Sequence, residues 1–409
     1  MKIVQINSVC GQGSTGRIAV DIAIEVERRG HVCYIAYGHG NTDYQRSYKI
    51  GNRFEHLLHN ILFSRLLGLQ GYGSIVSTLK FVKWLKKIKP DIIHIHNLHA
   101  NYINYRILFK YIISRKLPVI FTLHDCLNFT GKCTYFTANS CNKWKQECHK
   151  CPLYHKSGVP SIFFDWSRKM FRDKKMFYSR IERCKTIAVS KWLKEIAFES
   201  ILNCNGHSVS YIYNWIDHRV FKPADKEEIE RFYQKYDLPR DKRYLISVSQ
   251  EWDMSATRTE DALAIAEKLP DDYYLILVGR MNRSFELPKN IIHIPYISSQ
   301  MELAIAYSLA DVYVHLSIQD TFGLVIGEAM ACGTIPVTYN STACSETPSS
   351  FGIVVPPRDI NAIINSLSLI ESKKARRLEM IEFVKNTYDK TINIGQYIET
   401  YTEIVQNEI

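Results

Sequence analysis

The sequence lacks any long apolar segment. Its 409 residues contain no run of 18 or more apolar residues, so we expect no transmembrane helix. The N-terminal stretch MKIVQINSVC turns polar after a few residues, too soon for a secretory signal peptide. We therefore expect a cytoplasmic protein.

A disulfide framework is also missing. The eleven cysteines are an odd number and are mostly scattered, a pattern that favours free buried thiols in a reducing compartment. The exception is the loop 126–152, in which four cysteines are separated by seven, six and two residues: Cys133, Cys141, Cys148 and Cys151. Four thiolates at this spacing could hold a structural Zn²⁺. Free thiols or reversible disulfides are the alternative.

Acidic residues are scarce in the first half of the chain. Residues 1–222 hold 34 Lys and Arg against 14 Asp and Glu, whereas residues 223–409 hold 18 against 27. The first half is therefore basic, which suggests a phosphate-bearing partner, either nucleic acid or a membrane surface. Solvated surface lysine without a partner is the plainer reading. At 409 residues and 46% apolar content, two domains are expected.

The first domain opens with a strand over residues 2–7, followed by a glycine-rich turn and an amphipathic helix. The turn contains Gly13, Ser14 and Gly16, and the helix N-terminus after it would accept an anion. The next strand, 32–38, ends without the acidic residue that holds the ribose of a nicotinamide cofactor. This absence disfavours a dehydrogenase.

Residues 55–89 are apolar on one face and become rich in lysine before Pro90, which we expect to end a helix. Such a segment can lie on an anionic bilayer. It can equally cover the core of its own domain and leave its basic face in solvent.

Polar side chains follow two buried parallel strands, 91–97 and 118–125. His99 follows the first strand, and His124 and Asp125 close the second. His124 is a candidate hydrogen-bonding or acid/base group at the ligand edge of the sheet, with a purely structural histidine as the alternative. His94 and His96 share one face of the first strand, but the sequence offers no obvious third metal ligand.

The second half again alternates strands and helices, and its most informative segment is 316–337. There a strand is followed by Asp320, by Gly323 and by a helix that carries Glu328. Two acids around a phosphate-sized gap suggest a nucleotide sugar, with sugar hydroxyls on both sides of a diphosphate. An ordinary turn with two solvated acids remains the alternative.

Six segments in this order resemble the retaining glycosyltransferases of family 4: GSTGRI, PDIIHIHNLHANYIN, FTLHDCLNFTGKCTYF, VSKWL, NWIDHRVFKP and DTFGLVIGEAMACGTIPV. The resemblance implies an α/β fold of the GT-B type, with two facing Rossmann-like doubly wound parallel-sheet domains and a C-terminal helix that crosses back to the first domain. We place the domains at 1–222 and 223–390, with the helix at 391–409. The bacterial members build polysaccharide and lipopolysaccharide.

The resemblance also implies residue roles. Asp320 would contact the donor sugar and Glu328 its nucleotide ribose, while His124 would face the sugar near the anomeric carbon. The remaining donor-side residues are Gly13, Ser14, Gly16, Pro295, Phe322, Gly323 and Leu324, and the acceptor-side residues are His99, Asp125 and Asn214. The family's Arg/Lys pair is missing from its usual place, so the diphosphate cation would be Arg258 or Arg280.

The resembling enzymes move a sugar from a nucleotide donor, UDP- or GDP-linked, to a lipid-linked or saccharide acceptor. Catalysis would need no cofactor and no metal, which agrees with the absence of an Asp-x-Asp triplet. We expect a peripheral enzyme on the inner face of the cell membrane, with an anionic membrane surface and not nucleic acid as partner. The missing Arg/Lys pair motivates an alternative, a non-catalytic sugar-binding or scaffold subunit of a polysaccharide assembly complex. A sugar-nucleotide epimerase on the same fold is a third reading.

Overall fold

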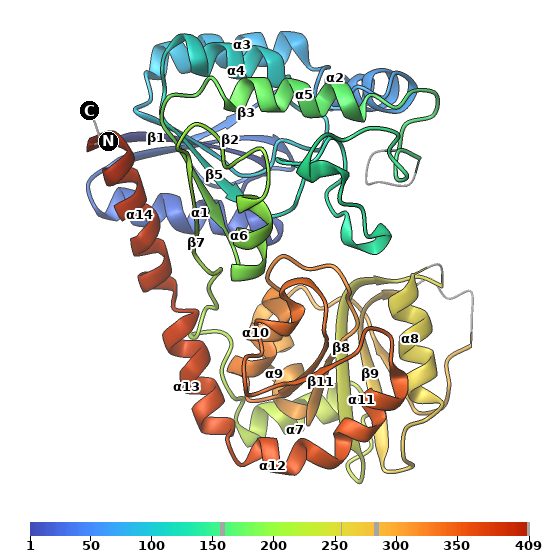
Figure 1. The fold of residues 1–409 in the computed structure, drawn as a ribbon. Coiled ribbons are helices and arrows are strands. Elements are labelled where there is room, and N and C mark those ends of the chain that lie inside the picture. Colours follow the sequence, from blue (N-terminus) through green and yellow to red (C-terminus); the bar gives the residue numbers. More distant parts are fainter. Residues whose placement is uncertain (156–159, 255, 282–285, 407–409) are drawn as a thin grey trace. The chain divides into compact units, whose positions relative to one another are not determined.

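The computed structural model describes residues 1–155, 160–254, 256–281 and 286–406. The chain forms two compact units, the first made of Met1–Ile212 and Ile392–Ile409 and the second of Tyr213–Thr391. Each unit is an α/β domain with a parallel sheet, as predicted (Figure 1). No helix in the described ranges is both long and apolar enough to span a bilayer.

Unit 1 contains a seven-stranded parallel sheet of order β3-β2-β1-β4-β5-β6-β7. The strands are β1 (Lys2–Val9), β2 (Val32–His39), β3 (Ser47–Lys49), β4 (Ile92–Ile95), β5 (Val119–Leu123), β6 (Cys184–Ala188) and β7 (Ser208–Tyr211). The helices are α1 (Gly13–Arg28), α2 (Arg53–Leu58), the π-helix η1 (His59–Leu66), α3 (Ile75–Ile88), α4 (Tyr105–Ser114), α5 (Ser167–Tyr178), α6 (Lys191–Phe198) and α14 (Lys390–Gln406), with 3₁₀ turns η2 (Thr137–Asn139) and η3 (Lys143–Lys145). Every residue of β4 and β5 is buried, as expected for a sheet covered on both faces.

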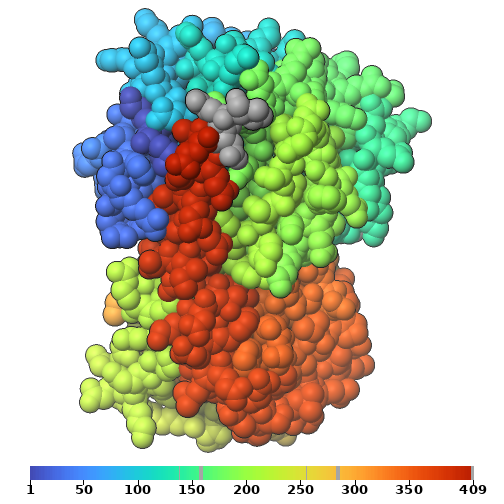
Figure 2. All heavy atoms as spheres, turned by 60° about the vertical axis from the view of Figure 1, so that its left-hand side comes forward, coloured from blue at the N-terminus to red at the C-terminus, as the bar shows by residue number. Residues whose placement is uncertain are grey.

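The C-terminal helix α14 packs on unit 1 from Ile392 onward. Figure 2 shows its red residues lying over the blue and green surface of this unit. Its inner face carries Tyr397 and Tyr401, both fully buried, and the Tyr401 hydroxyl lies 2.6 Å from Nδ1 of His94 on β4. This hydrogen bond ties the end of the chain to the central strands.

The expected single helix over 55–89 is wrong. The structure divides the segment into α2, η1 and α3. Gly68 and Gly71, which lie between η1 and α3, adopt left-handed backbone angles, with φ of +70° and +82°. Residues with a side chain rarely adopt such angles, and the glycines therefore interrupt the helical pattern.

Unit 2 contains a six-stranded parallel sheet of order β10-β9-β8-β11-β12-β13. The strands are β8 (Arg243–Trp252), β9 (Tyr273–Met281), β10 (Ile291–Ile294), β11 (Val312–His315), β12 (Ile335–Tyr339) and β13 (Ile353–Val355). The helices are α7 (Lys226–Lys235), α8 (Thr257–Ala266), α9 (Gln300–Leu309), α10 (Leu324–Ala331), α11 (Ile360–Ser366), α12 (Ile370–Lys374) and α13 (Arg377–Thr387), with 3₁₀ turns η4 (Thr342–Ser345) and η5 (Leu367–Leu369).

The boundary between the units lies between Ile212 and Tyr213, earlier than residue 222 where the sequence placed it. The reason is aromatic packing within unit 2: the ring of Tyr213 contacts those of Phe322 and Tyr388. Further along, the ring of Phe221 contacts that of Tyr307. The segment after β7 therefore belongs to the second core.

In each sheet the chain starts in the middle, moves outward on one side, and then returns to build the other side. The direction changes between β1 and β4 in unit 1 and between β8 and β11 in unit 2. Open α/β sheets bind ligands outside the carboxyl ends of their strands at such a switch point. Each unit thus has one place where a site is expected.

Candidate functional site

The carboxyl end of β11 leads directly into the segment with the two acids. Strand β11 ends at His315 and α10 begins at Leu324, after Gly323. Gly323 caps the helix with φ of +78°, and a Cβ at this position would lie 2.7 Å from Cδ1 of Ile326. The backbone angle therefore favours glycine, and a Cβ would in addition displace the flexible end of the Ile326 side chain.

Packing around Phe322 fixes the turn before α10. Phe322 is buried against Tyr213 and Tyr388, and its carbonyl accepts a hydrogen bond from the Thr347 hydroxyl. The first N–H groups of a helix have no partner within the helix, and their dipoles favour an anion. The fixed turn thus presents the N-terminus of α10 beside Asp320.

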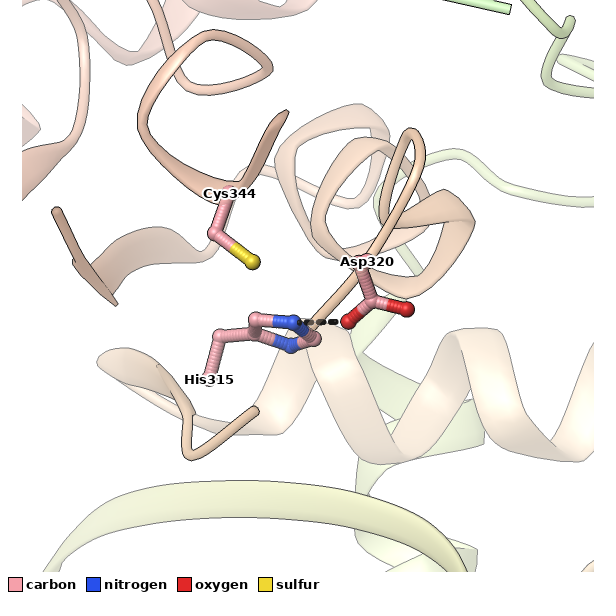
Figure 3. Close-up of side chains that lie close together, drawn as sticks. All are labelled: His315, Asp320 and Cys344. Carbon is pink, nitrogen blue, oxygen red and sulfur yellow. Dashed lines mark hydrogen bonds and ion pairs between the residues drawn. The ribbon is translucent and has the colours of Figure 1, made fainter. Parts of the chain in front are cut away.

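Asp320 is held by a histidine that the sequence analysis missed. Nε2 of His315 lies 2.7 Å from Oδ2 of Asp320, and Nδ1 of His315 lies 2.9 Å from the hydroxyl of Tyr313. His315 and Tyr313 are buried, whereas the side chain of Asp320 is 32% exposed. In Figure 3 the second carboxylate oxygen of Asp320 points away from the ring. One oxygen is therefore anchored, and the other faces outward.

The surroundings of His315 favour its charged form. Burial by itself lowers the pKa of His315, but the neighbouring Tyr313, Cys344 and Asp320 outweigh it, and the pKa lies well above its usual value. Nε2–H donates to the Asp320 carboxylate in this state. The signal in the sequence was a single polar residue inside the apolar strand VYVHLS, five residues before Asp320.

Cys344, at the η4 turn, points toward the same pair (Figure 3). The ligand atoms of His315, Asp320 and Cys344 all lie within 4.8 Å of one another, and no other group of three in the described ranges does so. Imidazole, carboxylate and thiolate are ligands that suit Zn²⁺. This is the arrangement in unit 2 that could hold a metal ion.

Glu328 lies on α10 and is 7% exposed. Burial raises the pKa of the Tyr307 hydroxyl well above its usual value, and the charge of Glu328 adds to this rise. The two acids therefore differ: Asp320 is partly exposed and tied to His315, while Glu328 is enclosed within the domain.

The two candidate cations follow neighbouring strands. Arg258, in the first turn of α8, donates from Nη1 to the Ser249 hydroxyl over 2.7 Å. Arg280, at the end of β9, lies over the ring of Tyr296 with 5.3 Å from Cζ to the centroid. Both arginines are exposed, as is Pro295 beside Tyr296. Because β8 adjoins β11, Arg258 follows the strand at the switch point.

Asn214, predicted on the acceptor side of the first domain, lies instead in unit 2. It is 5% exposed, and its Oδ1 has no hydrogen-bond partner within the protein. Its neighbour Tyr213 donates to Oε1 of Glu346 over 2.7 Å and packs on Phe322. Asn214 therefore belongs to the second unit and follows a side chain that packs on the turn before α10.

In unit 1 the predicted glycines form the turn between β1 and α1. Gly11 and Gly13 have φ of +71° and +62°, and the Gly11 N–H donates to the Gly16 carbonyl over 3.1 Å. Ser14, in the first turn of α1, is exposed. The turn therefore presents the N-terminus of α1 at the switch point of this sheet.

The predicted acceptor-side pair comes together at the ends of β4 and β5. Nε2 of His99 lies 3.2 Å from Oδ2 of Asp125, whose Oδ1 accepts the N–H of Leu127 over 2.8 Å. Burial lowers the pKa of His99, but the hydrogen bond and the charge of Asp125 outweigh it, and the pKa is raised. The pair is thus held in place by the loop that follows β5.

His124 belongs to a chain of hydrogen bonds between side chains. Its Nε2 lies 3.0 Å from Nδ1 of His96, whose Nε2 lies 2.7 Å from Oε1 of Gln5. The amide of Gln5 donates to the Ala19 carbonyl, so its oxygen accepts from His96, and Nε2–H of His124 donates to His96. Burial lowers the pKa of His124 to about 4.

The cysteine-rich loop has a small core of its own, which the sequence analysis did not anticipate. Trp144 is buried against the rings of Phe129 and Phe136, with centroids 5.2 and 4.9 Å away. The buried Lys174 donates to the carbonyls of Leu127 and Thr130. Aromatic packing and a buried ammonium therefore order this loop.

The four thiols of the loop influence one another electrostatically. Cys148 Sγ accepts the N–H of Gly131 over 3.1 Å, and burial raises the pKa of Cys133 to about 11. No three of them, as described, bring their sulfur atoms within 4.8 Å of one another. The thiols would have to move closer to bind zinc tetrahedrally, and zinc binding remains a prediction.

Comparisons with known proteins agree with this fold. Residues 15–220 match the family model Glycosyltransferase Family 4, and residues 228–387 match Glycosyl transferases group 1. The chain belongs to glycosyltransferase family 4. It is 20% identical over 367 residues to a protein of Escherichia coli (strain K12) named as a colanic acid biosynthesis glycosyl transferase, WcaC, with 86% of each chain covered.

Solved structures of the same fold cover nearly the whole chain. A glycosyltransferase from Rickettsia africae ESF-5 superposes with a TM-score of 0.69 at 17% identity, covering 100% of this chain and 99% of its own. HepE of Anabaena, in complex with UDP and glucose, superposes with a TM-score of 0.68 at 14% identity, covering 98% and 100%. These similarities confirm the GT-B fold class.

Proposed function

We propose that the protein is a retaining glycosyltransferase that moves a sugar from a nucleotide donor onto a lipid-linked or saccharide acceptor in the synthesis of a surface polysaccharide. The observation that carries this proposal is the pairing of Asp320 and Glu328 around the N-terminus of α10 at the switch point of unit 2. The ligands of HepE and the name of WcaC support the same class of substrate.

Each acid has a distinct proposed role. The outward oxygen of Asp320 would accept hydrogen bonds from donor sugar hydroxyls, while Glu328 would bind the ribose of a UDP- or GDP-linked donor. The N–H groups from Phe322 to Leu324 would hold the diphosphate. His124 in unit 1 would face the sugar near its anomeric carbon, and His99 and Asp125 would serve the acceptor.

In the reaction, the bond between the anomeric carbon and the β-phosphate oxygen breaks while the acceptor hydroxyl oxygen bonds to the same carbon from the same face. The hydroxyl proton passes to the departing phosphate. Negative charge grows on that phosphate, so fixed N–H dipoles and a cation stabilise the transition state most. No protein nucleophile and no metal ion is needed in this scheme.

We assign the diphosphate cation to Arg258. It follows the strand that adjoins β11, and Ser249 orients its guanidinium. Arg280 is engaged by Tyr296 beside Pro295, where a flat base could stack. Arg258→Gln should therefore weaken binding of UDP far more than that of uridine, and Arg280→Gln should weaken both. The reverse pattern would exchange the two roles.

The decisive experiment separates sugar recognition from nucleotide recognition. The affinities for UDP-glucose, UDP and a GDP-linked donor are measured by calorimetry. Asp320→Asn should lower the affinity for the sugar nucleotide and leave the affinity for the free nucleotide unchanged. Glu328→Gln should weaken both. Loss of a hydrogen bond to a charged group costs about 1.5–3 kcal/mol, or about 10- to 150-fold in affinity. Unchanged binding in both variants would remove the assignment.

A second candidate function is a non-catalytic sugar-binding subunit, favoured by Gln250 and Glu251 standing where a cation was expected. Slow donor hydrolysis by the purified protein, abolished in Glu328→Ala, would exclude it. Tight donor binding without any hydrolysis or transfer would support it.

The acceptor side is proposed to work at an anionic membrane surface, with the protein peripheral on its cytoplasmic face. The excess of Lys and Arg over Asp and Glu in residues 1–222, 34 against 14, supports this, because lipid phosphates attract such a surface.

A further inference from the structure

Helices α2 and η1 turn their apolar side chains toward solvent and their polar side chains toward the domain. Their outward side chains include Phe54, Leu57 and Ile61, which are 73%, 52% and 47% exposed. Their inward side chains are polar, with His56 and His59 buried. A helix that only covers its own domain shows the opposite arrangement.

The inward histidines fix this orientation. Nε2 of His59 accepts the N–H groups of Gly71 and Gly73 over 3.1 and 3.2 Å, so Nδ1–H donates to the Ser74 hydroxyl over 2.8 Å. His56 bonds to the Ile50 carbonyl through Nε2 over 2.8 Å. Turning the helices to bury their apolar side would break all of these hydrogen bonds.

Two further segments extend the exposed apolar surface. The start of α3 is tied to α2 and η1 by a hydrogen bond from Ser77 to Glu55 and by the bond between His59 and Ser74. Residues 162–166 adjoin η1, since the Ile162 N–H donates to the Arg65 carbonyl over 2.7 Å. We call the resulting surface the apolar platform: Phe54, Leu57, Leu58, Ile61, Leu62, Ile75, Val76, Leu79, Ile162, Phe163, Phe164 and Trp166.

The platform is not a chance scatter of apolar side chains. Within the described ranges, 12 of the 22 exposed large hydrophobic side chains belong to it. Single exposed apolar residues are ordinary on protein surfaces, but a contiguous patch of this kind marks an interaction site.

A row of cations borders the platform. Along the exposed face of α3, the apolar side chains of Ile75, Val76 and Leu79 are followed by exposed lysines at positions 80, 83, 86 and 87. The helix carries no acidic residue. Apolar side chains beside an uninterrupted row of lysines match the two layers of an anionic bilayer surface, with acyl chains below and phosphates above.

We propose that the apolar platform docks unit 1 onto an anionic bilayer, with its apolar side chains among the acyl chains and the α3 lysines at the headgroups. The proposal deepens the proposed function and rests on it in one respect, since a lipid-linked acceptor would bring the enzyme to a membrane. It differs from binding through charge alone, because the apolar side chains enter the bilayer.

The test is flotation of the full-length protein with vesicles of phosphatidylcholine, with and without phosphatidylglycerol. The variant Phe54→Ser/Leu58→Ser/Ile61→Ser should bind anionic vesicles at least about tenfold more weakly, given the apolar area that it removes. The control Ile24→Ser/Phe198→Ser changes residues of unit 1 that are 54% and 59% exposed outside the platform, and it should bind like the wild type. Equal binding by wild type and triple variant overturns the proposal.

The experiment also shows whether the platform binds something other than a bilayer. If sedimentation shows that the wild type dimerises and the triple variant is monomeric, with equal vesicle binding, the platform is an interface between copies and the proposal fails. Donor hydrolysis is measured in parallel and should be unchanged in the triple variant. Absence of hydrolysis in every form, with the expected flotation pattern, would refute the proposed function and leave the platform standing.

Discussion

His315 gives the sharpest test of how the site is built. We expect His315→Leu to damage the protein in two separable ways, because the ring bonds to Asp320 on one side and to Tyr313 on the other. The first loss concerns the donor sugar, since Asp320 is no longer oriented. The second concerns stability, since the buried hydroxyl of Tyr313 is left without its partner.

The loss of stability and the loss of sugar affinity have different physical causes. A buried hydroxyl without a partner costs about 1–3 kcal/mol of folding free energy. The lost hydrogen bond to the Asp320 carboxylate is worth about 1.5–3 kcal/mol where it is fully expressed, so sugar affinity should fall by about tenfold or more. The double variant Tyr313→Phe/His315→Leu removes the unpartnered hydroxyl. It should regain most of the stability and none of the affinity.

The assay pairs urea unfolding with calorimetry of UDP-glucose against UDP. His293→Leu is the matched control, since Nε2 of His293 bonds to the Gly279 carbonyl on the same sheet and His293 lies on β10, away from Asp320. His315→Gln, which keeps an N–H donor, should recover part of the sugar preference. If affinity returns together with stability in the double variant, His315 is purely structural and the reasoning is refuted.

Three further outcomes follow from particular residues. Burial lowers the pKa of His59 to about 3, below its unfolded value of about 6.5. The contribution of the neutral ring to the free energy of unfolding is therefore complete above about pH 6.5 and decreases below it, by about 2 kcal/mol at pH 5. Unfolding titrations should show this loss in the wild type and not in His59→Gln. Gly323→Ala should cost about 1–2 kcal/mol for its backbone angle, and the control Gly30→Ala, at φ of +80° with nothing within 4 Å, should cost about the same, because the Ile326 side chain that the new Cβ meets can move. Elemental analysis should find about one zinc per chain if the four loop cysteines bind it, and Cys148→Ser should lose that zinc while Cys332→Ser keeps it; a zinc-free folded protein contradicts the site.

Much of the fold could be predicted because buried parallel strands leave a clear sequence pattern. Segments such as 92–95 and 119–123 are apolar or β-branched along most of their length, and a proline precedes each of them. The short strands β3 and β13 could not be found, because their half-exposed residues show neither a buried run nor a clean alternation. Their positions depend on pairing with a neighbouring strand.

The acids of the candidate site could be predicted from their spacing around a glycine, since a strand, a turn and a helix are local features. The partner of Asp320 could not, because the bond to His315 depends on how the turn after β11 folds back. That fold is set partly from a distant segment: the Asp320 N–H donates to the hydroxyl of Thr342 over 3.1 Å. The placement of Asn214 was likewise decided by packing of the neighbouring Tyr213, which sequence spacing does not report.

The segment 53–66 shows where periodicity reaches its limit. Its apolar residues recur at the spacing of one helix face, and this pattern states only that they share a side. Which side meets the core is decided by the polar residues between them: His56 and His59 find buried partners in backbone groups that belong to other segments. A buried polar side chain is stable only where such partners exist, so these histidines face inward and the apolar side is left to solvent or to another surface. The same apolar spacing can therefore build a core or a docking surface, and the inward hydrogen bonds decide between the two.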